Sequence, residues 1–136
     1  MPLELINPAD LPMPEMYTQV VVATGSRMVF LSGQQPEGVD GKLIGEGDFA
    51  AQAQLAFGNV ARGLRAAGAR PDQVCKITIY IVDYDRDAHV PILEEAQIAV
   101  FGDHKPANVI IGVAVMSPGY LIEVDAIAVV DGTAAG

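Results

Sequence analysis

The chain has 136 residues, and we expect a single domain over residues 1–136 with a flexible tail from about residue 131. The net charge is −9 and no segment gathers Lys and Arg, which argues against binding to nucleic acid. The single cysteine excludes a disulfide framework, and no apolar run reaches the length of a membrane span, so we expect a soluble, cytoplasmic protein without a membrane partner.

The N-terminal part is expected to be rich in strands. Residues 5–8 form a first short strand, and three prolines then prevent regular structure until about residue 16. Residues 19–23 and 27–33 are two further strands. The turn Thr24-Gly25-Ser26 between them predicts a β-hairpin.

Two helices follow, with a strand between them. Asp48 is a suitable N-cap for a helix to about residue 67, whose apolar stripe consists of Ala53, Phe57, Val60, Leu64 and Ala67. The alternating residues 74–83 predict a strand. Asp87 is the expected cap of a second helix ending near Phe101, because Pro91 is tolerated only in a first turn.

The last two strands are expected at residues 108–115 and 121–130, which completes the order β-β-β-α-β-α-β-β. This order predicts an α+β domain in which both helices cover one face of a single mixed sheet. The other face would carry Thr78, Tyr80, Glu123 and Asp125 among aliphatic residues. In a chain that is 51% hydrophobic, such a face is too apolar for water alone, so we expect it to be an oligomer interface.

Glu123 and Asp125 are the first candidates for chemistry, because they lie on one face of the last strand, about 6–7 Å apart. A carboxylate held near a substrate proton or a water can act as an acid or base. The alternative is a solvated strand face without a catalytic role. Tyr17 is either a packing aromatic or a phenol facing a pocket.

The remaining candidates favour structural roles. His89 and His104 lack further ligands at metal spacing, so no metal site is predicted, and the simplest role for His104 is a cap at the end of the second helix. The apolar run around Cys75 favours an inert core thiol over a nucleophile.

Several motifs in order give the chain a resemblance that spans about residues 4–130. The stretches are MYTQ (16–19), FLSGQQP (30–36), AQAQLAFGNV (51–60), LRAAGARPDQVCKITIYIVD (64–83), FGDHKPA (101–107) and LIEVDAIA (121–128). The chain thereby resembles the Rid family, the YjgF-like deaminases of reactive enamines and imines. The resemblance implies a chorismate-mutase-like fold, a homotrimer with clefts between subunits, and a hydrolysis that needs no cofactor.

The resemblance also implies a set of site residues. Glu123 and Tyr17 would be catalytic, with Glu123 positioning or activating the attacking water and Tyr17 lining the cleft. The substrate-binding residues would be Asn108, Gly33, Ser32 and Ile110.

The chain departs from the family pattern at one of these positions. The deaminase branch has an Arg after Pro-Ala that clamps the substrate carboxylate, whereas this chain has Asn108, followed by Val109 and Ile110 in place of Ser/Thr and Cys/Thr. An amide cannot form a bidentate, charge-assisted pair. Because such a bond contributes about 1.5–3 kcal/mol, its loss weakens carboxylate binding roughly 10–150-fold. We therefore expect an altered substrate, such as a 2-aminomuconate-type enamine, instead of 2-aminoacrylate.

Two other functions remain open at this point. A trimer that binds or senses a small metabolite without catalysis is the main alternative, because it needs no clamp at Asn108. An endoribonuclease, an activity for which some family members are named, is disfavoured by the charge of −9.

Overall fold

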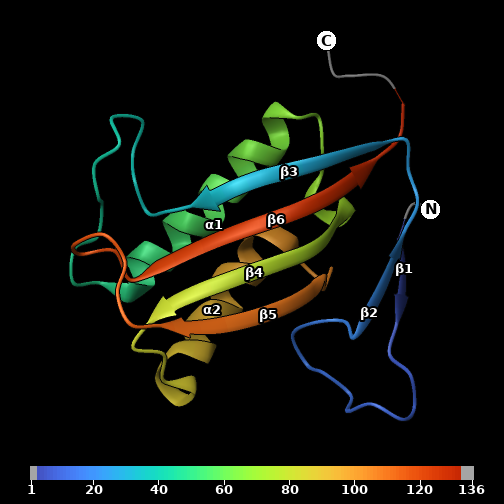
Figure 1. Ribbon diagram of the computed structural model, residues 1–136, viewed down its shortest axis with the longest axis horizontal. Helices are drawn as coiled ribbons and strands as arrows, with labels where there is room; N and C mark the ends of the chain where they lie inside the picture. Colours follow the sequence, from blue (N-terminus) through green and yellow to red (C-terminus); the bar gives the residue numbers. More distant parts are fainter. Residues whose placement is uncertain (1–2, 133–136) are drawn as a thin grey trace.

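A mixed four-stranded sheet is the centre of the fold in the computed structural model, which describes residues 3–132 (Figure 1). Within these residues the elements are β1 (Leu3–Ile6), β2 (Val20–Ala23), β3 (Arg27–Gln34), α1 (Phe49–Ala66), the 3₁₀ turn η1 (Pro71–Gln73), β4 (Val74–Val82), α2 (Arg86–Phe101), β5 (Ala107–Val113) and β6 (Ile122–Val130). The predicted order of strands and helices is confirmed. Most of the predicted tail lies outside the described residues.

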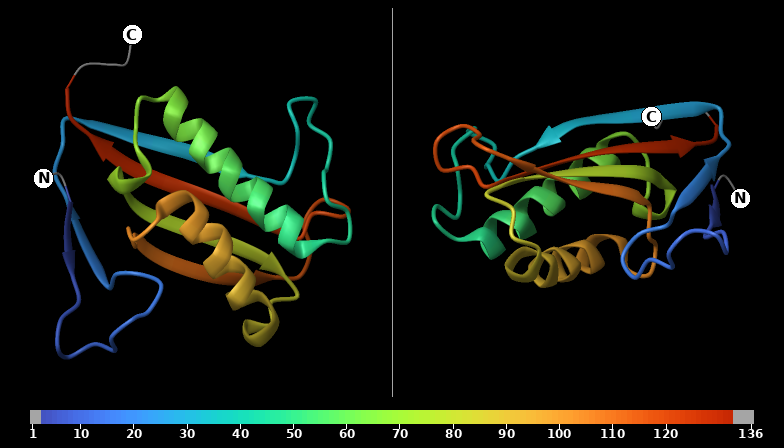
Figure 2. Two further views of the ribbon diagram at one scale, coloured as in Figure 1. Left: turned by 180° about the vertical axis from the view of Figure 1, so that it is seen from behind. Right: turned by 60° about the horizontal axis from the view of Figure 1, so that its bottom comes forward.

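The strand order in this sheet is β3-β6-β4-β5, with β4 and β5 parallel and the other neighbours antiparallel. Both helices cover one face, α1 over β3 and β6, and α2 over β4 and β5 (Figure 2). The predicted α+β layering is therefore confirmed. No helix among residues 3–132 is long and apolar enough to cross a membrane.

The core lies between the helices and the sheet. Ile77, Ile79 and Ile81 point from β4 toward the helices and are fully buried, as strand alternation requires. From α1, Phe57 and Leu64 pack against them, and each large side chain buried in this way contributes about 1.5–3 kcal/mol. The predicted α1 stripe is confirmed for Ala53, Phe57, Val60 and Leu64, whereas Ala67 is the half-buried C-cap. Asp48 caps the helix by accepting from the amide of Ala51 at 3.1 Å.

The predicted hairpin of residues 19–33 is wrong. β2 pairs with β1 in a separate two-stranded antiparallel sheet, and β3 pairs with β6. Gly25 lies between β2 and β3 against the end of β6, where a Cβ would come within 2.9 Å of the carbonyl oxygen of Val130. The glycine therefore allows the connection between β2 and β3 to approach the end of β6 closely.

The start of α2 also differs from the prediction. Asp85, not Asp87, is the N-cap, and its carboxylate accepts from the amide of Asp87 at 3.0 Å. The ring of His89 accepts from the Asp85 amide at 2.9 Å and fixes this earlier start. Pro91 consequently lies inside the helix and not in its first turn, and Arg86 becomes the first helical residue.

The predicted capping role of His104 is wrong as well. Its Nε2 donates to the carbonyl of Val74 at 2.7 Å, which ties the end of α2 to the first residue of β4. The helix ends instead at Gly102, whose φ of 58° is one that glycine adopts readily.

Candidate functional site

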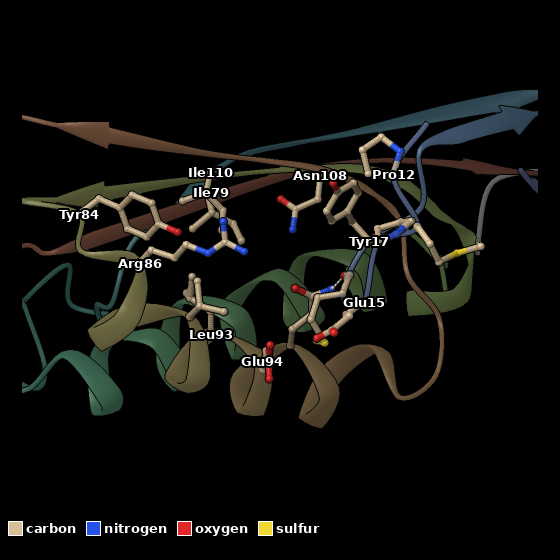
Figure 3. A pocket seen from close by; sticks show the side chains of 15 residues that line it. Pro12, Glu15, Tyr17, Ile79, Tyr84, Arg86, Leu93, Glu94, Asn108 and Ile110 are labelled. Carbon is tan, nitrogen blue, oxygen red and sulfur yellow. Dashed lines mark hydrogen bonds between the residues drawn. The ribbon is translucent and has the colours of Figure 1, made fainter. Parts of the chain in front are cut away.

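A cavity of about 480 Å³ lies on the helix side of the sheet, between α2, β5 and the loop that precedes β2 (Figure 3). Three of the predicted site residues line it, namely Tyr17 from the loop and Asn108 and Ile110 from β5. Its volume is within the range of small-molecule sites. The cavity is therefore the first candidate for a binding site.

The loop carrying Tyr17 is held in place by buried amides. Gln97, which is buried in α2, donates from Nε2 to the carbonyl of Met16 at 3.0 Å. The amide of Thr18 donates to the carbonyl of Pro106 at 3.3 Å, immediately before β5. Both contacts bring Tyr17 to the entrance of β5, although 90 positions separate it from that strand in the sequence.

Asn108 has an unusual environment. It lies opposite Ile77 in the parallel β4–β5 pair and shares the helix-side face with Ile110. Its Oδ1 is buried and, among the described residues, is the only buried side-chain polar atom without a hydrogen-bond partner. Because leaving such an atom unsatisfied costs about 1–3 kcal/mol, the amide is suited to a donor on a ligand.

The other predicted residues lie on the opposite face of the sheet. Glu123 pairs with Tyr80 and is half-buried on the face that the helices leave open. A Cβ on Gly33 would come within 2.9 Å of Glu123 Cγ, so the glycine lets the bulged end of β3 approach this carboxylate. Ser32 precedes it and is exposed.

The predicted residues thus form two groups that the sheet separates. Tyr17, Asn108 and Ile110 form one group, and Glu123 with the Ser32–Gly33 segment forms the other. Asp125 lies opposite Thr78 on the same open face as Glu123, as the strand spacing predicts. One copy of the chain does not bring the two groups together.

Sequence reasoning missed five polar residues that line the cavity, namely Glu15, Tyr84, Arg86, Glu94 and Gln97. The signal of Arg86 becomes visible only when α2 is known to begin at this residue. A cation in the first turn of a helix is unfavourable by about 0.3–1 kcal/mol, and such a local conflict often marks a functional position. Gln97 gave no such signal, because a buried glutamine looks like a surface residue in a sequence.

Cys75 and the histidines do not form a reactive centre. The Cys75 thiol donates to the carbonyl of Ile127 at 3.3 Å, and burial raises its pKa, so the unreactive protonated form is favoured. It is partly buried and not a full core residue. Over residues 3–132 no cluster of His, Cys, Asp or Glu could hold a metal ion.

The fold and the site define a small α+β domain with a ligand-sized cavity at the edge of its sheet. A family model described as Endoribonuclease L-PSP matches residues 10–130, and the chain belongs to this family, which confirms the Rid, YjgF-like resemblance. A crystal structure of the Rid family protein YyfB from Yersinia pestis matches with a TM-score of 0.87 and 30% identity, covering 95% of this chain and 99% of that one.

Curated relatives agree with this assignment. Protein HMF1 of Saccharomyces cerevisiae is 33% identical over 103 residues, 76% of this chain and 77% of its own length. The 3-aminoacrylate deaminase RutC of Acinetobacter baylyi is 27% identical over 128 residues, which cover 94% and 98% of the two chains. The family thus includes a relative named for enamine deamination.

Proposed function

We propose that this protein is a cofactor-independent hydrolase that releases ammonia from a reactive enamine or imine. The observation that carries the proposal is the buried Oδ1 of Asn108, which has no hydrogen-bond partner within residues 3–132 and belongs to the cavity that Tyr17 also lines. An enamine or imine nitrogen brings the N–H that this acceptor lacks. The relative named as a 3-aminoacrylate deaminase supports the same class of reaction.

In the proposed reaction, the enamine first tautomerises to an imine, gaining a proton from solvent on carbon and losing one to solvent from nitrogen. Glu123 accepts a proton from water while the water oxygen bonds to the imine carbon and the imine nitrogen takes a proton from solvent, which gives a carbinolamine. The C–N bond then breaks as Glu123 returns its proton to the nitrogen, so that ammonia leaves, and the hydroxyl loses its proton to solvent and becomes the carbonyl of the oxo product. Water is the only co-reactant. Tyr17 and the backbone at Gly33 border this site.

The reaction requires a second copy of the chain, because Glu123 and Asn108 lie on opposite faces of the sheet. The open face supports association, since it exposes Met28 (60%), Phe30 (67%) and, at lower levels, Val109 and Ile111. We propose a homotrimer, with each site formed by the cavity of one copy and the Ser32–Gly33 and Glu123 surface of the next.

The substrate is expected to differ from 2-aminoacrylate. Asn108 offers one amide where a bidentate clamp would be needed, and Ile110 makes the cavity wall apolar. Val109 lies on the open face with Thr78 and does not line the cavity. A larger enamine of the 2-aminomuconate type therefore fits the proposal better, and we place the activity in the cytoplasm.

Ammonia and oxo-acid release from aliphatic and dienoic imines generated in solution tests this function. Glu123→Gln should lower the rate by about 10²–10⁴-fold, the usual contribution of a general base. Asp125→Asn is the matched control, since Asp125 is a half-buried carboxylate on the same strand face. If Glu123→Gln hydrolyses every substrate at the wild-type rate, the proposed mechanism is wrong.

Mixed trimers test whether two copies share the site. Glu123→Gln and Tyr17→Phe each damage a different surface, so random mixing should restore about a quarter of the sites. No recovery after subunit exchange would show that each copy works alone. Tight metabolite binding with no turnover of any imine would instead favour the non-catalytic alternative.

A further inference from the structure

We propose that Arg86 binds the anionic group of the substrate, so that the site selects enamines or imines with a carboxylate remote from the nitrogen. This inference rests on the proposed function for the identity of the nitrogen group, and on the cavity alone for the anion. The positive charge that binds the anion would thus be supplied by α2 and not by position 108 of β5.

Arg86 is the only basic residue that lines the cavity within residues 3–132. Its guanidinium forms no ion pair with any of these described residues, although Asp85 and Asp87 flank Arg86 in the sequence. Figure 3 shows it reaching from the start of α2 across the cavity, beside Ile79 and Ile110 and close to Tyr84. A planar, unpaired guanidinium in this position is suited to a carboxylate.

A negative charge borders the other end of the cavity. Glu15 lies beside Tyr17, away from Arg86, whereas Glu94 lies between the two ends on the α2 side (Figure 3). The Glu15 carboxylate repels an anion from the Tyr17 end. It therefore orients an anionic ligand with its negative group toward Arg86.

The same ligand can satisfy Asn108. Ile110 follows Asn108 by two residues, about 6–7 Å along β5, and Arg86 lies on the Ile110 side (Figure 3). A ligand with its nitrogen at Asn108 would pass the apolar wall of Ile79, Ile110 and Leu93 before its carboxylate meets Arg86. A substrate with nitrogen and carboxylate on one carbon would not span this distance.

Binding to the full-length protein tests the proposal with three ketones. 5-Oxohexanoate has a carbonyl remote from its carboxylate, 2-hexanone is the uncharged analogue, and 2-oxohexanoate has the two groups adjacent. Because Arg86 is exposed, we expect the lower end of the charged-bond range, about a tenfold preference for 5-oxohexanoate over 2-hexanone. Arg86→Gln should abolish this preference and leave 2-hexanone binding unchanged.

Arg65→Gln is the matched control, since Arg65 is exposed in the last turn of α1 and does not line the cavity. The proposal is overturned if Arg86→Gln weakens 2-hexanone and 5-oxohexanoate equally, if it weakens neither, or if 2-oxohexanoate shows the larger loss. Arg86-dependent binding without turnover of any imine would refute the proposed deaminase and leave the anion site standing. Turnover of an imine by a protein that binds 5-oxohexanoate no more tightly than 2-hexanone would refute the anion site and leave the proposed deaminase standing.

Discussion

Replacing Asn108 by leucine should make the protein more stable and less active. Leucine has nearly the shape of asparagine but carries no polar atom. The substitution removes the buried Oδ1 that has no partner among the described residues. The folded state then no longer contains this unsatisfied acceptor, while the proposed substrate loses its hydrogen-bond partner.

The size of the effect follows from two opposing contributions. Removing an unsatisfied buried acceptor is favourable by about 1–3 kcal/mol, and imperfect packing of the branched side chain offsets up to about 1.5 kcal/mol of this. We therefore expect Asn108→Leu to stabilise the protein by about 1 kcal/mol. For a chain of 136 residues this raises Tm by about 3–5 °C.

Asn59 is a suitable control for the same chemical change. Its Nδ2 donates to the carbonyls of Gln35 (2.9 Å) and Glu37 (3.1 Å), and its Oδ1 accepts from Arg62 at 3.1 Å. Asn59→Leu breaks these three bonds and should destabilise the protein by about 1–2 kcal/mol. The two substitutions are thus expected to have opposite signs.

Thermal unfolding at one fixed protein concentration measures both variants, because the stability of the proposed trimer would depend on concentration. Imine hydrolysis by the same preparations completes the comparison. The reasoning is refuted if Asn108→Leu destabilises as strongly as Asn59→Leu, since Oδ1 would then have a donor in the assembled protein. Increased stability with full activity would remove Asn108 from the substrate site.

Three further outcomes can be measured on single variants. Gln52→Ala should destabilise the protein by about 3 kcal/mol in urea unfolding, because the buried amide makes three hydrogen bonds to backbone groups, whereas the exposed Gln54→Ala should change stability by less than about 0.5 kcal/mol. Cys75 should react slowly with a thiol reagent at pH 8 and faster as pH rises, because burial raises its pKa, and Cys75→Ala should keep full activity. Tyr120 donates to Glu37 at 2.5 Å and this bond raises its pKa, so it stabilises the fold below about pH 10 and this contribution disappears as pH rises through the raised pKa. Tyr120→Phe should therefore be less stable than wild type at pH 8, with a gap that closes in strongly alkaline solution; a gap that stays constant would contradict this origin.

The predictions that succeeded for the fold rest on local signals. The Asp48 cap and the apolar stripe of α1 both depend on residues within one helix, and both are confirmed. The hairpin failed because the partner of β3 is β6, about 100 residues away, and a short turn carries no information about so distant a strand. The start of α2 was misplaced because His89 makes a hydrogen bond that favours Asp85 as the cap.

Only those residues of the candidate site that belong to family motifs could be predicted from the sequence. Tyr17, Asn108 and Ile110 were named from the family resemblance, and they do line one cavity. The sheet separates these residues from Glu123, because Glu123 shares a face with Tyr80 and Asn108 shares the other face with Ile77. The alternation of residues along the strands was enough to predict this separation. Neither alternation nor motif indicates which side chains of a helix close a cavity over that face.

Asn108 and Arg86 are best understood together. A neutral residue at the start of β5 would leave a carboxylate-bearing substrate without a cation there. The same cavity contains the guanidinium of Arg86, which forms no ion pair within residues 3–132 and lies at a helix start that disfavours positive charge. An arginine at both positions would place two like charges in one cavity of about 480 Å³, where each disfavours the other in the absence of an anion. A neutral side chain such as Asn108 avoids this repulsion when position 86 is an arginine. Asn108 at the start of β5 therefore agrees with the proposed site if the proposed substrate carries its carboxylate remote from the nitrogen, and it does not require that the proposed activity is lost.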